Sequence, residues 1–227
     1  MESEVCLGPR LKLARQLPAL SRHRPFGVLP LAPTGHNARG KLGLALTFGG
    51  SMETLSLEDF IDDKPWGDDV PFLEDIPGEN LVAGVRIQRL VTRGDKRGDL
   101  TVLMSALLEP ITPPPHVYLV SAEVGSIRAW VYHKRQFDRL AYTNGDIRVV
   151  LYDLRKDSPT YQKINVLDVG AANKILLTIP PYVVHGVQNR GKSTATFVNM
   201  PTNVYDPKNP DKSRVRFDHP GIPYKFE

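Results

Sequence analysis

The sequence predicts an all-β fold, a β-sandwich or jelly-roll barrel, and three observations support this. From Leu81 onward, eight short β-rich segments follow one another with turn signals, and no helical pattern, between them. The chain contains 20 Pro and 18 Gly, which suits a fold with many turns. Its hydrophobic fraction of 41% is enough to form a core. The expected strands are 82–90, 100–107, 117–120, 127–132, 147–151, 164–169, 175–179 and 194–198.

Turn residues delimit these segments. Asn144-Gly145 is typical of a type I′ hairpin turn, in which both central residues need positive φ. Pro180-Pro181 marks a position outside a hydrogen-bonded ladder, because proline has no N–H to donate. The alternation of short strands and turns therefore favours a sandwich or barrel.

The segment before the strands is acidic and predicts one short helix around 56–61. Ser56 is placed to cap this helix, and Asp59 lies in its first turn. We therefore expect residues 52–87 to form an N-terminal arm with a short helix, followed by a β domain over residues 88–227.

The first 51 residues differ from the rest. They are rich in Arg, Leu, Pro and Gly and show no helix or strand period. A transit peptide, a secretory signal and a start codon assigned too early are the three interpretations. The segment lacks the Ser-rich amphipathic pattern of a transit peptide, and Pro and Arg break its longest apolar stretch. We expect a disordered or mis-started extension, with translation beginning at Met52.

Charge and cysteine content exclude several classes. The net charge of +4 comes from residues 1–51, which hold seven basic and two acidic residues; the remainder holds 22 basic and 23 acidic residues. We therefore expect no nucleic-acid partner. No apolar run approaches the roughly 20 residues that cross a bilayer, so no membrane span is expected. Cys6 is the only cysteine, which favours a reducing compartment, and we expect a cytoplasmic protein.

Two motifs carry the strongest functional signal. The first is Gly125-x5-Val131-x-His133-x4-Asp138-x6-Gly145. The second runs from Pro180 to Asn189, with Tyr182 and His185 inside it. Together they resemble the two motifs of the cupin superfamily, G-x5-H-x-H-x4-E-x6-G and P-x-G-x-x-H-x3-N. This resemblance implies a cupin jelly-roll barrel, and the sequence departs from the motifs at Val131, Asp138 and Tyr182.

Longer runs resemble the dTDP-4-dehydrorhamnose 3,5-epimerase family over residues 88–226. The run 150–161 contains D-L-R-x-x-S-P-T-Y, and the run 179–186 contains I-P-x-x-x-x-H-G. The resemblance also rests on 128–133, on 201–207, and on Asp95 to Gly98. It implies an isomerase of a dTDP-linked 4-keto-6-deoxyhexose that needs no cofactor, and a homodimer in which Arg97 reaches the partner's pocket.

The resemblance also implies specific roles for residues. The family's catalytic histidine aligns with Val131, and its proton-donating tyrosine aligns with Asn199; neither side chain here transfers protons. The aspartate that pairs with the histidine aligns with Asp218. Positions that hold substrate align with His185 and Arg128. In addition, Arg139 replaces a substrate-binding lysine, Val102 replaces a glutamate of the nucleotide pocket, and Trp130 and Tyr132 are candidates to stack on base or sugar.

The residues themselves suggest where the chemistry has moved. His133 lies two residues after Val131, so both point to the same face of a strand, and His133 can act as base one register step along. His185 is the second candidate, and a structural role is the alternative for both. We expect no metal, although His133, Asp138 and His185 together form a two-histidine, one-carboxylate set suited to Fe(II) and similar ions.

Three functions follow from this reading. The first is a nucleotide-sugar epimerase or isomerase in bacterial surface-polysaccharide synthesis, with His133, His185 and Asp218 as catalytic residues. The second is a cupin that binds sugar nucleotides without catalysing proton transfer. The third is a metal-dependent cupin. No G-x-S-x-G, Walker or dinucleotide glycine motif indicates another chemistry.

Overall fold

The computed structural model describes residues 55–63, 72–105 and 113–227. The chain divides into two compact units, residues 1–61 and 62–227. In the first, a 3₁₀ helix, η1 (Leu57–Asp59), occupies the position of the expected short helix. The Ser56 hydroxyl accepts a hydrogen bond from the Glu58 N–H, and the Asp59 carboxylate accepts one from the Ser56 N–H. Met52 and the extension before it lie outside the described residues.

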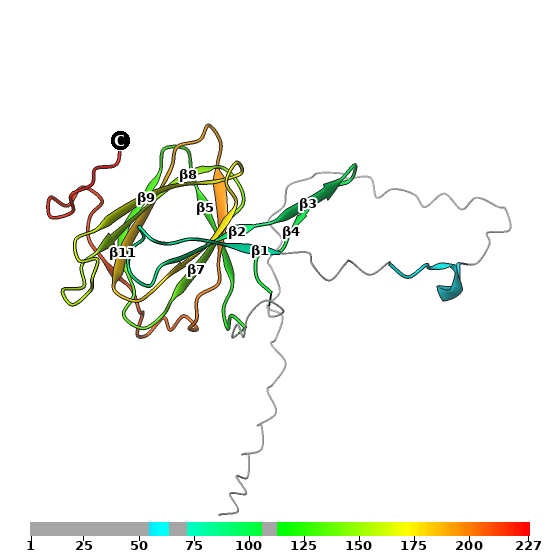
Figure 1. The fold of residues 1–227 in the computed structure, drawn as a ribbon, viewed down its shortest axis with the longest axis horizontal. Helices are drawn as coiled ribbons and strands as arrows, with labels where there is room; N and C mark the ends of the chain where they lie inside the picture. The colour runs from blue at the N-terminus through cyan, green and yellow to red at the C-terminus, as the bar shows by residue number, and fades with distance from the viewer. Residues whose placement is uncertain (1–54, 64–71, 106–112) are drawn as a thin grey trace, which may run out of the picture. The chain divides into compact units, whose positions relative to one another are not determined.

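The second unit is built from two antiparallel sheets and a hairpin (Figure 1). In order across the six-stranded sheet, the strands are β1 (Leu73–Ile76), β2 (Arg86–Leu90), β10 (Ile175–Ile179), β7 (Asp138–Tyr142), β12 (Ala195–Asn199) and β5 (Tyr118–Ala122). In order across the five-stranded sheet, they are β13 (Ser213–Arg214), β6 (Ile127–Tyr132), β11 (Val183–Asn189), β8 (Asp146–Asp153) and β9 (Ile164–Gly170). The hairpin pairs β3 (Thr92–Asp95) with β4 (Gly98–Thr101).

The all-β prediction is confirmed, as a two-sheet jelly roll. One apolar cluster joins the sheets: Leu140 and Leu177 from the six-stranded sheet pack with Val149, Leu151 and others from the five-stranded sheet. In the described residues the two sheets keep separate edges and do not close into one barrel. No helix there is long and apolar enough to span a membrane.

The predicted Asn144-Gly145 turn connects β7 to β8, but the hairpin prediction is wrong, because these strands belong to different sheets and do not pair with each other. The type I′ conformation is absent too, since Gln162 and Tyr182 are the only non-glycine residues with positive φ in the described part of the chain. Gly145 has φ of 80°, and a Cβ built there would lie 2.3 Å from the Cβ of Ala195. Only glycine combines this backbone conformation with so close an approach. Gly145 therefore allows the chain to pass from the six-stranded sheet to the five-stranded sheet at the end of the first motif.

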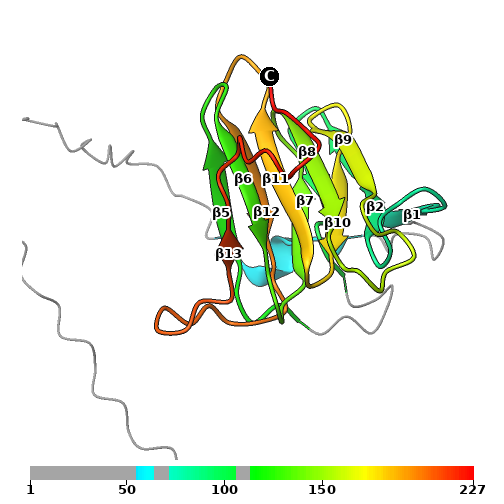
Figure 2. The ribbon, with the colours of Figure 1, turned by 90° about the vertical axis from the view of Figure 1, so that its left-hand side faces the viewer.

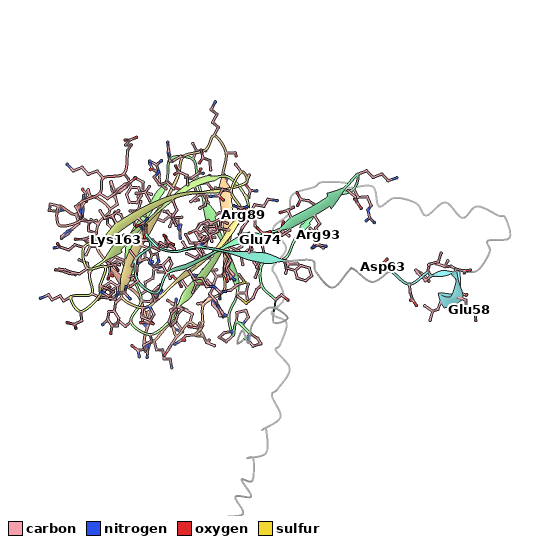
Figure 3. All side chains as sticks on the ribbon, in the orientation of Figure 1. Glu58, Asp63, Glu74, Arg89, Arg93 and Lys163 are labelled. Carbon is pink, nitrogen blue, oxygen red and sulfur yellow. The ribbon has the colours of Figure 1, made fainter. Side chains whose placement is uncertain are left out.

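The N-terminal strands belong to the six-stranded sheet. β1 pairs with β2, and β2 pairs with β10. Residues 73–76 and 86–87, which we expected in the arm, therefore belong to the sheet, and residues 77–85 connect the two strands. Glu74 and Arg89 face each other across this pair with 3.8 Å between Oε2 and Nη1 (Figure 3). The β3–β4 hairpin extends away from the sheets (Figure 1).

The C-terminal segment covers the outer face of the five-stranded sheet (Figure 2). Ile222, Tyr224 and Phe226 pack there with Trp130 and Val184. The Trp130 indole N–H also donates to the Phe217 carbonyl at 3.0 Å. This face is therefore closed, and the inner face of the same sheet is left to form a site.

Two central strands, β7 and β11, were absent from the predicted strands. Their sequences, D-R-L-A-Y and V-V-H-G-V-Q-N, carry polar residues at positions that the structure buries. Buried polar residues remove the alternation by which strands are identified in a sequence. These polar positions include Asp138 and His185, which form the site described next.

Candidate functional site

A cavity of about 300 Å³ lies between the two sheets. β5, β7 and β12 contribute to its wall from the six-stranded sheet, and β6, β11 and β13 contribute from the five-stranded sheet. A second cavity, of about 230 Å³, shares Tyr118, His133 and Lys212 with the first. These three residues therefore mark the boundary between the two spaces.

The inner cavity holds a buried cluster of His133, Asp138 and His185. Asp138 begins β7 and is 3% exposed; His185 lies on β11, and His133 directly follows β6. Oδ2 of Asp138 lies 3.2 Å from Nε2 of His133 and 3.3 Å from Nε2 of His185. One carboxylate oxygen therefore faces both imidazole rings.

Backbone carbonyls orient the two rings. Nδ1 of His133 contacts the Asp211 carbonyl, and Nδ1 of His185 lies 3.1 Å from the Val183 carbonyl. Because a carbonyl oxygen only accepts hydrogen bonds, each Nδ1 must carry a proton to make its bond. Proton exchange at these rings is therefore assigned to Nε2, the nitrogen that faces the carboxylate.

The other oxygen of Asp138 is held by two amides. Its Oδ1 accepts hydrogen bonds from Gln136 Nε2 at 2.8 Å and from Asn199 Nδ2 at 3.1 Å. These bonds fix the carboxylate plane, so that Oδ2 alone is directed at the histidines.

The environment favours a proton on His133 rather than on the Asp138 carboxylate, as the pKa shifts of both groups indicate. Burial opposes the charge of Asp138, but hydrogen bonds from His133 and His185 outweigh it and hold the carboxyl pKa far below its usual range. Burial also opposes the charged form of His133, yet the bond to Asp138 and its charge raise the pKa of His133 above its ordinary value. This cluster can accept a proton and stabilise the resulting imidazolium.

Three cationic side chains line the same cavity: Arg128, Lys212 and Arg214. Burial, and then the neighbouring charge of Arg214, lower the pKa of Lys212. Over the described residues, none of the three forms an ion pair. A group of like charges without acidic partners is typical of an anion-binding site.

The same donor set could hold a divalent metal ion, since ligand atoms of His133, Asp138 and His185 lie within 4.8 Å of one another. Such an ion would share the cavity with Arg128, Lys212 and Arg214, whose charges repel it. The electrostatics of the cavity therefore favour an anionic ligand over a bound dication.

Two buried polar atoms of the cavity wall have no partner among the described residues. They are the hydroxyl oxygen of Tyr142, which is fully buried, and Oδ1 of Asn199. Buried polar atoms are nearly always hydrogen-bonded in folded proteins. Their position in the wall is what a site for a polar ligand requires.

Tyr118 completes the wall on the side of β5. Its hydroxyl oxygen accepts a hydrogen bond from Asn199 Nδ2 at 2.8 Å. Burial, and then the charge of Asp138, raise the pKa of Tyr118. No sequence pattern indicates this residue, because 81 positions separate it from Asn199. Lys212 and Arg214 were missed likewise, in a charged segment without a strand pattern.

The structure brings some predicted site residues to the cavity and places others elsewhere. His133, His185, Asp138 and Arg128 line it, as do Val131 and Asn199. Asp218 instead lies 2.8 Å from Arg216 in an exposed ion pair, outside the cavity wall.

Arg97 lies in the β3–β4 hairpin and pairs with Asp95 at 2.6 Å, also outside this cavity. Arg139 is buried, and its Nε donates to the Met200 carbonyl at 2.7 Å. Neither is brought to the cluster by this chain alone.

The two aromatic candidates point away from the cavity. Trp130 is buried on the outer face, with its ring centroid 4.9 Å from that of Phe226. Tyr132 stacks on Tyr182 with ring centroids 5.9 Å apart. Val131, between them, faces inward, because alternate residues of a strand point to opposite faces.

Comparisons with known proteins agree with this architecture. The sequence model described as dTDP-4-dehydrorhamnose 3,5-epimerase matches residues 115–226. The spore coat polysaccharide biosynthesis protein SpsL of Bacillus subtilis is 31% identical over 146 residues, which are 64% of this chain and 97% of that protein. The probable low-salt glycan biosynthesis epimerase Agl13 of Haloferax volcanii is 34% identical over 136 residues, 59% of this chain and 87% of that protein.

Among solved structures, the dTDP sugar isomerase of Desulfovibrio desulfuricans G20 superposes with a TM-score of 0.60 at 26% identity. The match covers 63% of this chain and 91% of that one. The fold and the sequence-model match point to the same family, and the SpsL alignment covers nearly all of that protein. This chain therefore belongs to the dTDP-4-dehydrorhamnose 3,5-epimerase family.

Proposed function

We propose that this protein is a nucleotide-sugar epimerase or isomerase that acts on a dTDP-4-keto-6-deoxyhexose in polysaccharide synthesis. Family membership supports the reaction class. The names of SpsL and Agl13 support the pathway, since one refers to spore coat polysaccharide and the other to glycan biosynthesis. The proposal concerns this chain's own cavity, in which the proton-transfer groups of the family are rearranged.

One observation carries the proposal: the cavity combines a carboxylate-backed pair of imidazoles with three cations that form no ion pair with any described residue. A 4-keto sugar has acidic protons at C3 and C5, beside its ketone, and a base near neutral pKa can remove them. The diphosphate of a nucleotide sugar carries negative charge that Arg128, Lys212 and Arg214 can bind. The keto sugar thus matches the histidine–aspartate cluster, and the diphosphate matches the three cationic side chains.

We assign the base to His133 rather than to position 131. Val131 lines the cavity but cannot accept a proton, whereas His133 lies one step along the same face and at the boundary of both cavities. Its Nε2 takes the proton, and Asp138 stabilises the imidazolium. Asp138 thereby fills the role that the family resemblance gave to Asp218. His185, bound to the same oxygen, shares the charge.

We also propose a homodimer in the cytoplasm, as the family resemblance implies. The β3–β4 hairpin extends from the sheets (Figure 1). Arg97 lies in its turn with an exposed side chain, which a second copy could receive. Light scattering after size exclusion tests the assembly, and a monomer at working concentration would contradict it.

The experiment follows dTDP-4-keto-6-deoxyglucose by NMR with the full chain in deuterium oxide. We expect deuterium to enter at C3 or C5 and an epimerised or isomerised product to appear. Line broadening of the dTDP resonances reports binding in the same sample. Binding without exchange would contradict the proposal and identify the protein as a sugar-nucleotide-binding member of the family, as the substitutions at Val131 and Asn199 would then explain.

A further inference from the structure

We infer that Tyr118 is the residue that returns a proton to the sugar, from the opposite side to His133. This inference rests on the proposed function and assigns the second proton-transfer group of the same site. It is carried by the position of Tyr118 at the boundary of the two cavities and by its bond to Asn199.

The two sheets supply the two sides of the site. Inversion at a carbon requires that the proton leave from one face and that a new proton arrive on the other. His133 and His185 come from the five-stranded sheet, whereas Tyr118 is the first residue of β5 in the six-stranded sheet. We therefore place the imidazoles on one side of a sugar ring held between the sheets, and the phenol on the other.

The hydroxyl of Tyr118 is free to donate. Asp138 can only accept hydrogen bonds, so its bond with Asn199 fixes the amide with Nδ2 toward the carboxylate. The same Nδ2 donates to the Tyr118 oxygen. Tyr118 is the acceptor in that bond, so its own O–H proton is not used there, and no acceptor for it occurs among the described residues.

The environment keeps this proton in place until it is needed. Burial and the charge of Asp138 raise the pKa of Tyr118, so the phenol stays protonated at neutral pH. After proton transfer, the Asn199 amide can donate to the phenolate. Asn199 thus connects the acid to the carboxylate that supports the base, and it acts as a positioning residue.

The step balances without any further reagent. The C–H bond at C3 or C5 breaks, its proton goes to Nε2 of His133, and its electron pair forms the enolate with negative charge on the C4 oxygen. The electron pair then returns to the carbon, which takes the proton from the Tyr118 hydroxyl. Water afterwards removes the proton from His133 and protonates the phenolate, so no proton is gained or lost overall.

The test is Tyr118→Phe in the full chain, assayed in deuterium oxide with dTDP-4-keto-6-deoxyglucose. With the base intact, deuterium still replaces the proton at C3 or C5. It is added on the face from which the proton was removed, so the configuration of that carbon is retained. Formation of the epimer falls about 10²–10⁴-fold, the usual contribution of a positioned acid. Tyr161→Phe is the matched control, because Tyr161 is 42% exposed and lines neither cavity. It should match the wild type.

The outcomes separate this inference from the proposed function. Wild-type epimer formation by Tyr118→Phe overturns the role of Tyr118 and leaves the proposed function standing. Loss of both exchange and epimer, with dTDP binding unchanged, also overturns it, because the phenol would then be needed for proton removal. Absence of exchange in the wild type overturns the proposed function itself.

A second variant covers failure of Tyr118→Phe to fold. Asn199→Ser retains Tyr118 but removes the amide that binds its hydroxyl. We expect a lower ratio of epimer formed to deuterium exchanged than in the wild type. An unchanged ratio would contradict the coupling of Tyr118 to Asn199.

Discussion

Among the described residues, two carboxylates, Asp138 and Asp153, are buried, and their surroundings differ. Asp153, at the end of β8, is 0% exposed and binds the guanidinium of Arg155 through two bonds of 2.8 and 2.9 Å. Ser158 and Thr160 also donate to it, at 2.5 and 2.7 Å. Asp138 is equally buried but faces two histidines and a cavity.

The difference lies in what the partners can do. Arg155 always carries its charge. Its Nη2 also donates to the Ala83 carbonyl at 2.7 Å, so the Asp153 network joins the loop after β8 to the turn before β2. The partners of Asp138 are imidazoles, side chains that can accept and release a proton. The D-L-R-x-x-S-P-T run therefore stabilises the fold, whereas we propose that Asp138 supports proton transfer.

Asp138→Asn should produce the largest loss of activity. Without the carboxylate the imidazolium of His133 is no longer stabilised, and deuterium exchange at C3 or C5 should fall about 10²–10⁴-fold. The free energy of unfolding should change by less than about 2 kcal/mol, because the histidines can become neutral instead of remaining charged and unpaired. Exchange followed by NMR and urea unfolding measure the two effects. Exchange within threefold of wild type would contradict this role.

Asp153→Asn should have the opposite profile. It leaves Arg155 charged without its partner, so the free energy of unfolding should fall by about 3–5 kcal/mol, the range for broken buried ion pairs. Under conditions where the variant is still folded, the exchange rate should be close to that of the wild type. Urea unfolding beside the exposed Asp157→Asn tests this. Equal stability of the two variants would remove the structural role.

The pH dependence should follow the raised pKa of His133. The base form is the neutral ring, so exchange should rise with pH and reach its plateau above the raised pKa, which exceeds the ordinary 6.5. Stability runs the other way: the contribution from His133 is complete below 6.5 and is lost as pH rises through its folded pKa. In Asp138→Asn the inflection should move to lower pH. An inflection below 6.5 in the wild type would contradict the assignment.

Metal removal should have the smallest effect. The three cations of the cavity oppose a dication, so elemental analysis of the purified protein should find far less than one ion per chain. Treatment with a chelator should leave exchange unchanged. A stoichiometric metal lost in both His133→Ala and His185→Ala would instead assign the cluster to a metal centre.

The sequence predicted the sheets and the histidines better than the rest of the cavity wall. His133 and His185 follow from motif spacing. The position of the Asn144-Gly145 turn follows from local backbone chemistry, but the pattern did not show that the turn joins two sheets instead of forming a hairpin. Tyr118 and Lys212 reach the site only through the pairing of β12 with β5 and of β13 with β6, contacts between distant segments that leave no local pattern. Asp218 is the opposite case. The family resemblance placed it beside the catalytic base, but in the structure it forms an exposed ion pair with Arg216.

The most direct test compares the wild type with His133→Gln in deuterium oxide, with dTDP-4-keto-6-deoxyglucose as substrate. Glutamine retains polarity at this position but cannot act as a base at neutral pH. The account predicts deuterium at C3 or C5 with the wild type, and a rate at least about 100-fold lower with His133→Gln while dTDP still binds. Equal exchange by the two proteins would show that the proton is removed elsewhere and would contradict the central claim.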